Sequence, residues 1–128
     1  MAVGAFIDNN CTVTLTNTAI VRNSASNGGG VYNNGTLTVT NSTIAGNSAT
    51  VAGGGICIND NGKLTLSNCT ISANMATNEG EGGGIYNHNG ILTIYNTIVA
   101  KNYWSEDDIR TTKELFEAYK ELLDNNVC

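Results

Sequence analysis

The segment Asn41-Ser42-Thr43-Ile44-Ala45-Gly46-Asn47 decides the fold, because its pattern N-x-x-[IV]-x-x-N occurs four times in the chain. The other three copies occupy residues 17–23, 68–74 and 96–102. The first asparagines of successive copies lie 24, 27 and 28 residues apart, while the spacing inside each copy does not change. An internal repeat of this length is typical of a solenoid, in which one coil of chain stacks on the next.

Glycines and alternating strands fill the rest of each repeat. Triple glycines occupy residues 28–30, 53–55 and 82–84, and a turn glycine follows at Gly35, Gly62 and Gly90. After each turn, apolar and polar residues alternate, which predicts a strand with one buried and one solvated face. The apolar members are Val13 and Leu15, Leu37 and Val39, Leu64 and Leu66, and Leu92 and Ile94.

The predicted fold is an all-β solenoid, namely a right-handed, single-stranded parallel β-helix of three to four coils. Stacking places equivalent residues about 4.8 Å apart. Interior columns are then expected at Ile20, Ile44, Ile71 and Val99 and at Ala25, Ala49 and Ala76. We expect the asparagines at corners, because asparagine tolerates left-handed backbone angles and its amide can bond the next amide along the stack. We expect the glycine triplets at corners with positive φ.

The sequence divides into repeats at residues 1–104 and a different segment at residues 105–128. In the second segment an apolar stripe of helical spacing is formed by Leu115, Tyr119 and Leu122, with Phe116 and Leu123. Thr111 and Glu114 match a capping box at the start of this helix. We predict a C-terminal amphipathic helix that lies across the last coil as a cap. Two alternatives are a helix that binds a partner and unrelated sequence reached by a frameshift.

Residues 6–11 align with residues 30–35, the end of a coil, so the chain opens in mid-coil. Solenoids normally carry a capping element over the first edge strands, and none is recognisable before Cys11. We therefore expect either a fragment of a longer protein, or an N-terminal face that is covered by a partner or by self-association with a second copy.

The repeats resemble those of a known group of proteins. Residues 41–49, 53–56 and 83–87 are similar to the repeats of bacterial right-handed β-helix surface proteins with a pectin-lyase-like fold, and to those of the chlamydial polymorphic outer membrane proteins. The resemblance covers roughly residues 4 to 102. It implies an exported protein, extracellular or at the cell surface, whose coils serve in adhesion or surface display. Residues 1–10 lack the basic start and apolar core of a signal peptide.

Composition excludes two classes of partner. The net charge is −5, and the six Lys and Arg residues form no cluster, which argues against nucleic acid. No apolar run approaches the roughly 20 residues of a membrane-spanning helix.

Candidate catalytic groups are few. The acids of the coils, Asp8, Asp60, Glu79 and Glu81, occupy non-equivalent turns, and His88 is the chain's one histidine. Glu79 and Glu81 could bind a cation loosely, although a solvated loop is the simpler interpretation. Asp107 and Asp108 are neighbours, which in an extended segment point opposite ways and in a first helical turn would favour the helix dipole. We expect no enzyme activity, catalytic residue, cofactor or metal in this chain.

The four cysteines, Cys11, Cys57, Cys69 and Cys128, are spaced unlike a zinc site and allow three disulfide connectivities. Cys57 takes the outward tyrosine position of the neighbouring coils, and Cys69 follows a corner asparagine. We expect free thiols.

Outward threonines offer a further candidate surface. Thr12, Thr14 and Thr16 and then Thr36, Thr38 and Thr40 begin a grid of the kind that orders water in ice-binding proteins. The following rows, Lys63-Thr65-Ser67 and Ile91-Thr93-Tyr95, interrupt it. An adhesive face would instead show an aromatic row such as Tyr32, Tyr86 and Tyr95.

We therefore predict a structural or adhesive β-helix segment that displays a polar repetitive face to a glycan or a cell-surface protein. The alternatives are a fragment of a carbohydrate-active β-helix enzyme, a polysaccharide lyase or hydrolase whose catalytic coils lie elsewhere, and, third, ice binding.

Overall fold

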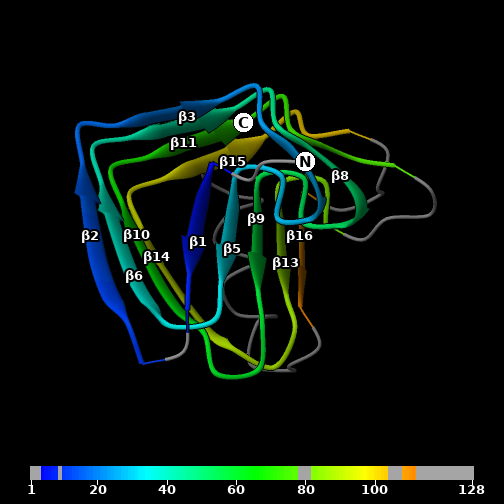
Figure 1. Ribbon diagram of the computed structural model, residues 1–128. Coiled ribbons are helices and arrows are strands. Elements are labelled where there is room, and N and C mark those ends of the chain that lie inside the picture. Colours follow the sequence, from blue (N-terminus) through cyan, green and yellow to red (C-terminus); the bar gives the residue numbers. More distant parts are fainter. Residues whose placement is uncertain (1–3, 9, 78–81, 104–107, 112–128) are drawn as a thin grey trace.

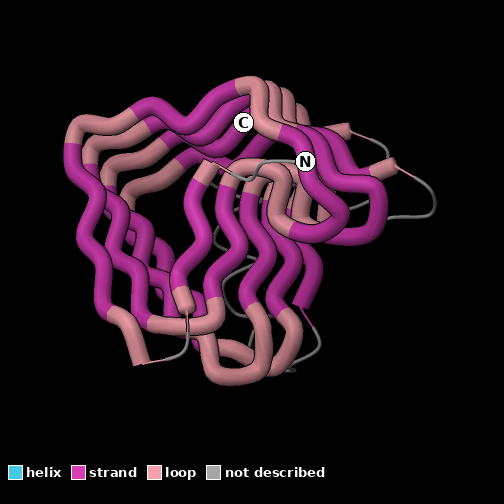
Figure 2. Tube along the Cα trace, in the orientation of Figure 1, coloured by secondary structure: helices cyan, strands magenta, loops and turns pink. Residues whose placement is uncertain are grey.

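The computed structural model describes residues 4–8, 10–77, 82–103 and 108–111. In this part of the chain every regular element is a strand, and the strands form four parallel sheets around a common interior (Figure 1). Figure 2 shows the strands of each sheet following one another from coil to coil. The described residues include no helix with the length and apolar character that crossing a membrane requires.

Each coil adds one strand to each sheet in turn. The first sheet contains β1 (Ala5–Ile7), β5 (Val31–Asn33), β9 (Ile56–Ile58), β13 (Ile85–Asn87) and β16 (Ile109–Thr111). The second contains β2 (Thr12–Thr16), β6 (Thr36–Thr40), β10 (Lys63–Ser67) and β14 (Ile91–Tyr95). The third contains β3 (Ala19–Val21), β7 (Thr43–Ala45), β11 (Thr70–Ser72) and β15 (Ile98–Ala100). The fourth contains β4 (Ser24–Asn27), β8 (Ser48–Ala52) and β12 (Met75–Ala76). This order confirms the parallel solenoid of three to four coils.

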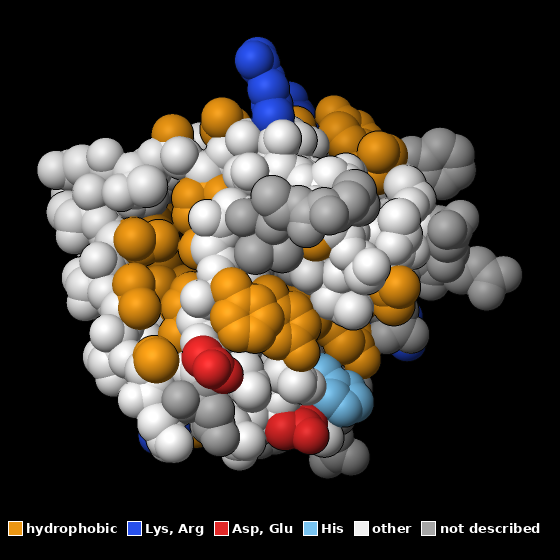
Figure 3. Space-filling view, in the orientation of Figure 1, with side chains coloured by type: hydrophobic (Ala, Val, Ile, Leu, Met, Phe, Trp, Pro, Cys, Tyr) orange, Lys and Arg blue, Asp and Glu red, His pale blue; other side chains and the backbone are white. Residues whose placement is uncertain are grey.

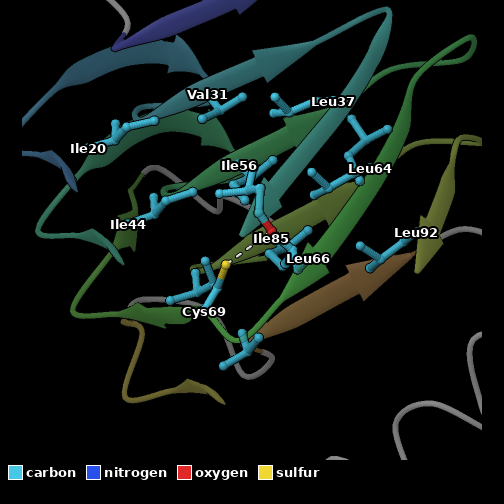
Figure 4. Close-up of a cluster of buried hydrophobic side chains, with 14 of the residues drawn as sticks. Ile20, Val31, Leu37, Ile44, Ile56, Leu64, Leu66, Cys69, Ile85 and Leu92 are labelled. Carbon is cyan, nitrogen blue, oxygen red and sulfur yellow. Dashed lines mark hydrogen bonds between the residues drawn. The ribbon is translucent and has the colours of Figure 1, made fainter. Parts of the chain in front are cut away.

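The interior is built from the predicted columns. Ile44 pairs in register with Ile20 and Ile71, and Ile71 pairs with Val99. All four side chains are buried, as are the three alanines of the second column. Figure 4 shows Leu37, Leu64 and Leu92 of the second sheet reaching the same core from another side. The alternation of the sequence therefore assigns inward and outward residues correctly.

The two asparagines of each motif have different structural roles. The first has positive φ in every copy: Asn17, Asn41, Asn68 and Asn96. The second continues a polar ladder and is buried at Asn47 and Asn74 and half-buried at Asn23 and Asn102. In this ladder Asn47 Nδ2 donates to Asn74 Oδ1 over 2.9 Å, and Asn74 Nδ2 donates to Asn102 Oδ1 over 3.0 Å. The left-handed corner thus belongs to the first position and the continuous amide ladder to the second, although Asn96 Nδ2 also donates to Asn68 Oδ1 at the first position.

The expectation for the glycine triplets is correct only for the first glycine. Gly28, Gly53 and Gly82 have positive φ, whereas the other triplet glycines do not. The second and third are needed for close packing of the coils, because a Cβ on Gly54 would overlap the main-chain oxygens of Gly83 and Met75. Steric exclusion by the next coil therefore explains the rest of each triplet.

The alignment expected for residues 6–11 is wrong by two residues in β1. Phe6 pairs with Tyr32 and Ile7 with Asn33, while Thr12 pairs with Thr36. The turn between β1 and β2 is therefore two residues longer than the turn between β5 and β6. This places Ile7 in the core and Phe6 on the outer surface.

The solenoid extends beyond the boundary expected after residue 104. β16 pairs with β13, and the Asp108 carboxylate accepts hydrogen bonds from the Asn102 main-chain N over 2.8 Å and from Asn102 Nδ2 over 2.9 Å. Asp108 therefore precedes a strand and takes the place of the next ladder asparagine, instead of starting a helix. The apolar stripe predicted for the C-terminal helix, residues 115–123, lies outside the described residues.

Candidate functional site

The outward residues of the first sheet form an aromatic row. Register places Phe6, Tyr32, Cys57, Tyr86 and Arg110 at equivalent positions. Phe6 is 60 % exposed and stacks on Tyr32, with ring centroids 5.3 Å apart and ring planes 10° from parallel. Inward neighbours such as Val31 and Ile56 anchor these strands in the core. The row is consequently held by a rigid sheet, as a preorganised surface requires.

Two turns beside the row add polar groups. Asn59 Nδ2 donates to the Tyr32 hydroxyl over 3.0 Å. His88 Nε2 lies 3.4 Å from Asp60 Oδ1, and His88 Nδ1 lies 3.2 Å from the Tyr86 hydroxyl. Because a carboxylate only accepts, in neutral His88 the hydrogen belongs on Nε2, and Nδ1 accepts from Tyr86.

We call Phe6, Tyr32, Asn59, Asp60, Tyr86 and His88 the aromatic cluster. Figure 3 shows its surroundings, with apolar side chains gathered beside the histidine and acidic side chains on the face turned to the viewer. The cluster depends on turn length. Residues 59–62 connect β9 to β10, whereas residues 34–35 suffice between β5 and β6. The longer turn brings Asn59 to Tyr32 and Asp60 to His88.

Two groups of the outward row on the first sheet, Cys57 and Tyr32, have raised pKa values. Burial raises the pKa of the Cys57 thiol to about 12. The pKa of Tyr32 is also raised, mainly by burial and then by the nearby Cys57 and Asp60, against the opposing hydrogen bond from Asn59. Both side chains are therefore protonated at neutral pH, and the surface offers hydroxyl, amide, imidazole and carboxylate groups beside aromatic carbon.

The aromatic row predicted from the sequence needs one correction. Tyr32 and Tyr86 do share a row, but Tyr95 lies on β14 in the second sheet, in register with Ser67. The third aromatic residue of the row is Phe6 instead of Tyr95. The repeat pattern does not reveal Phe6, because the turn before Thr12 is two residues longer than the equivalent turn, and it does not reveal the pairing of Asp60 with His88. The available signal was that both residues follow strands of the same sheet in successive coils.

The threonine rows lie in the register predicted for them. Thr14, Thr38, Thr65 and Thr93 form one column on the second sheet. The column on one side of it changes from threonine to Lys63 and Ile91, and the column on the other side changes to Ser67 and Tyr95. The threonine grid therefore does not continue on either side of the central column.

The cysteines and the remaining acids are scattered. Cys11, Cys57 and Cys69 are free thiols, as predicted, and the Cys69 thiol donates to the Val39 main-chain oxygen over 3.3 Å. Figure 4 draws this bond as a dashed line.

Glu79, Glu81, Asp107 and Cys128 lie outside the described residues. Among the described residues, no group of three or more His, Cys, Asp or Glu side chains could hold a metal ion.

The comparison with protein families agrees with this architecture. A family model described as a right-handed β-helix region matches residues 1–116. No curated protein matches the chain, and no solved structure matches it. The match covers most of the chain and gives the hand of the observed parallel solenoid. The chain belongs to the right-handed β-helix family.

Proposed function

We propose that this chain is a structural and adhesive β-helix segment of an exported bacterial surface protein, and that it presents the aromatic cluster to a glycan. The observation that carries the proposal is the cluster itself, in which the exposed ring of Phe6 and the half-buried rings of Tyr32 and Tyr86 stand beside an amide, an imidazole and a carboxylate. The rest of the described solenoid serves as the rigid support.

The chemistry of the cluster favours a sugar over a protein ligand. Sugar rings carry C–H groups that pack against aromatic carbon, and hydroxyl groups that need hydrogen-bond partners. Phe6 supplies an exposed ring, and Asp60 and His88 supply an acceptor and an imidazole within 3.4 Å of each other. Polar groups placed beside apolar contact area are the usual basis of orientation and specificity in small-molecule sites. A protein partner at the cell surface is the second possibility within this function.

The same proposal includes the cellular location, the class of partner and the C-terminal segment. Similarity to exported β-helix proteins, including the chlamydial polymorphic outer membrane proteins, supports an extracellular or cell-surface location. The charge of −5 supports partners other than nucleic acid. We also infer that residues 112–128 form the amphipathic helix that their apolar spacing predicts.

A fragment of a carbohydrate-active enzyme is the second candidate. It is favoured by the contact of Asp60 with His88, because carboxylate and imidazole groups serve as general acids and bases. Their side chains are 61 % and 45 % exposed, however, and lack the desolvation that usually tunes catalytic groups. We therefore assign binding to the cluster. Release of reducing or unsaturated ends from a polysaccharide panel, lost in His88→Ala, would favour the enzyme instead.

The test is a binding titration of a glycan panel and a panel of host surface proteins on the immobilised chain. Phe6→Ala and Tyr86→Ala are expected to weaken glycan binding by about tenfold each, the range of a lost aromatic contact. Tyr103→Ala is the matched control, because Tyr103 is 52 % exposed and pairs with Met75, outside the first sheet. Absence of binding to every member of both panels would contradict the proposal.

A further inference from the structure

The last full coil carries apolar residues at outward positions where the earlier coils are polar. Ile91 is in register with Lys63, Tyr95 with Ser67, and Ile98 with Thr70. One coil earlier the same positions hold Thr36, Thr40 and Thr43. We call Ile91, Tyr95 and Ile98 the last-coil band. Their side chains are 52 %, 60 % and 51 % exposed.

The fold itself does not require apolar residues at the band. The preceding coils form the same sheets with lysine, serine and threonine at these positions. The inward residues of the last coil, Leu92 and Val99, are buried separately. Ile91 and Tyr95 lie on β14 in the second sheet, and Ile98 lies on β15 in the adjoining third sheet. Large apolar side chains at outward positions that are polar in the preceding coils indicate a contact surface.

The chain beyond the described residues begins next to this band. β16 ends at Thr111, which pairs with Asn87 at the end of β13. Asn87 precedes Ile91 by four residues, so Thr111, the last described residue, lies beside the turn that leads into β14. The remaining 17 residues, 112–128, contain the stripe of Leu115, Tyr119 and Leu122.

The dimensions of the stripe and the band match. Tyr95 follows Ile91 by four positions along the strand, a span of about 13 Å. Leu122 follows Leu115 by seven positions, which in a helix is a span of about 10 Å. A helix of this length is marginal alone and needs a surface to pack against.

Charge also favours this pairing. Residues 112–128 contain four acidic and two basic side chains. Of the cations among the described residues, Lys63 pairs in register with Ile91, and Lys101 and Arg110 belong to the last coil or follow it directly. An acidic helix over β14 would therefore meet Lys63 beside Ile91.

We propose that residues 112–128 dock as an amphipathic helix on the last-coil band. The band faces outward, so the helix lies along the flank of β14 and β15. This location differs from a lid over the open end of the stack, and it explains why positions that hold lysine, serine and threonine in the two preceding coils carry large apolar side chains in this coil.

Hydrogen exchange of the full chain tests the proposal. The test variant is Ile91→Lys, Tyr95→Ser and Ile98→Thr combined, since each replacement is the residue that the preceding coil carries in register. Peptides from residues 112–128 are expected to be protected in the wild type and to exchange at least about tenfold faster in the triple variant. Val51→Thr is the control, because Val51 is 52 % exposed in β8, outside the band, and it should leave that exchange unchanged.

Three outcomes would overturn the proposal. The first is exchange of residues 112–128 at the rate of an unfolded peptide in the wild type. The second is equal protection in the wild type and the triple variant. The third is a dimer of the wild type, seen by sedimentation velocity, that the triple variant abolishes without any change in the exchange of residues 112–128. That result would assign the band to a second copy of the chain.

Discussion

Asn47 illustrates at the residue scale how one side chain connects three coils. Its Nδ2 donates to the Ile20 main-chain oxygen and to Asn74 Oδ1, each over 2.9 Å. Its Oδ1 accepts from the Asn23 main-chain N over 2.9 Å. The side chain is 1 % exposed, so water cannot replace these partners. The ladder therefore satisfies backbone groups that the corner would otherwise leave buried and unpaired.

Replacing Asn47 by alanine should destabilise the fold by roughly 2–4 kcal/mol, because buried donors and acceptors in two neighbouring coils lose their partner. Urea denaturation followed by circular dichroism measures this change. Thr50→Ala is the control, since Thr50 is exposed in the following strand and should change stability by less than about 0.5 kcal/mol. Equal midpoints for the two variants would show that the ladder carries no net stability.

Cys57 provides a pH-dependent prediction. Its pKa is raised from 9.0 to about 12 in the folded chain, so above pH 9 the unfolded thiol loses its proton while the folded thiol retains it. The contribution of this group to stability is complete below pH 9 and decreases as the pH rises towards 12. The free energy of unfolding should fall by up to about 1.4 kcal/mol per pH unit more steeply in the wild type than in Cys57→Ala. Urea melts at several pH values above 9 measure both slopes, and parallel slopes would contradict the assignment.

At the scale of elements, the strands could be predicted and the turns could not. Strict alternation at Leu37 and Val39 is repeated at Leu64 and Leu66, and a shift of one residue would expose both pairs. The register of the second sheet therefore follows from the sequence. The length of a turn is not fixed by the burial of apolar side chains. The two extra residues before Thr12 therefore could not be recognised in the sequence, and Phe6 was aligned with the wrong residue. The strand at Ile109–Thr111 was also missed, because three residues show too little periodicity.

The glycine triplets lead to a prediction about the packing of one coil on the next. Gly54→Ala should prevent cooperative folding, because the new Cβ would overlap main-chain oxygens of the following coil. Gly46→Ala is the matched comparison. Its Cβ would lie 4.0 Å from the nearest atoms, and its φ of 67° resembles the 55° of Ala73, the residue at the equivalent position one coil later. Only the left-handed backbone opposes this second change, at a cost of about 1 kcal/mol.

Circular dichroism and urea melts of the two glycine variants distinguish steric exclusion from backbone conformation. A Gly54→Ala protein as stable as Gly46→Ala would mean that the coils can separate at the triplet. The packing account of the second and third glycines would then be wrong.

At the scale of the whole molecule, different sheets carry different surfaces. The aromatic cluster belongs to the first sheet and its turns, and the threonine column belongs to the second. The sequence identified Tyr32, Tyr86 and the threonines, since each occupies an outward position of a regular strand. It could not identify the meeting of Asp60 with His88, because that contact depends on the path of two irregular turns.

The central claim is that the aromatic cluster is the binding surface of this solenoid. The most direct measurement is an amide chemical-shift map of the full chain, titrated with the tightest-binding glycan of the panel. The account predicts that the largest shifts occur in the turn residues 59–62 and 88–90 and in β1, β5 and β13. Shifts centred on the threonine column of β2, β6, β10 and β14, or shifts that Phe6→Ala leaves unchanged, would contradict it.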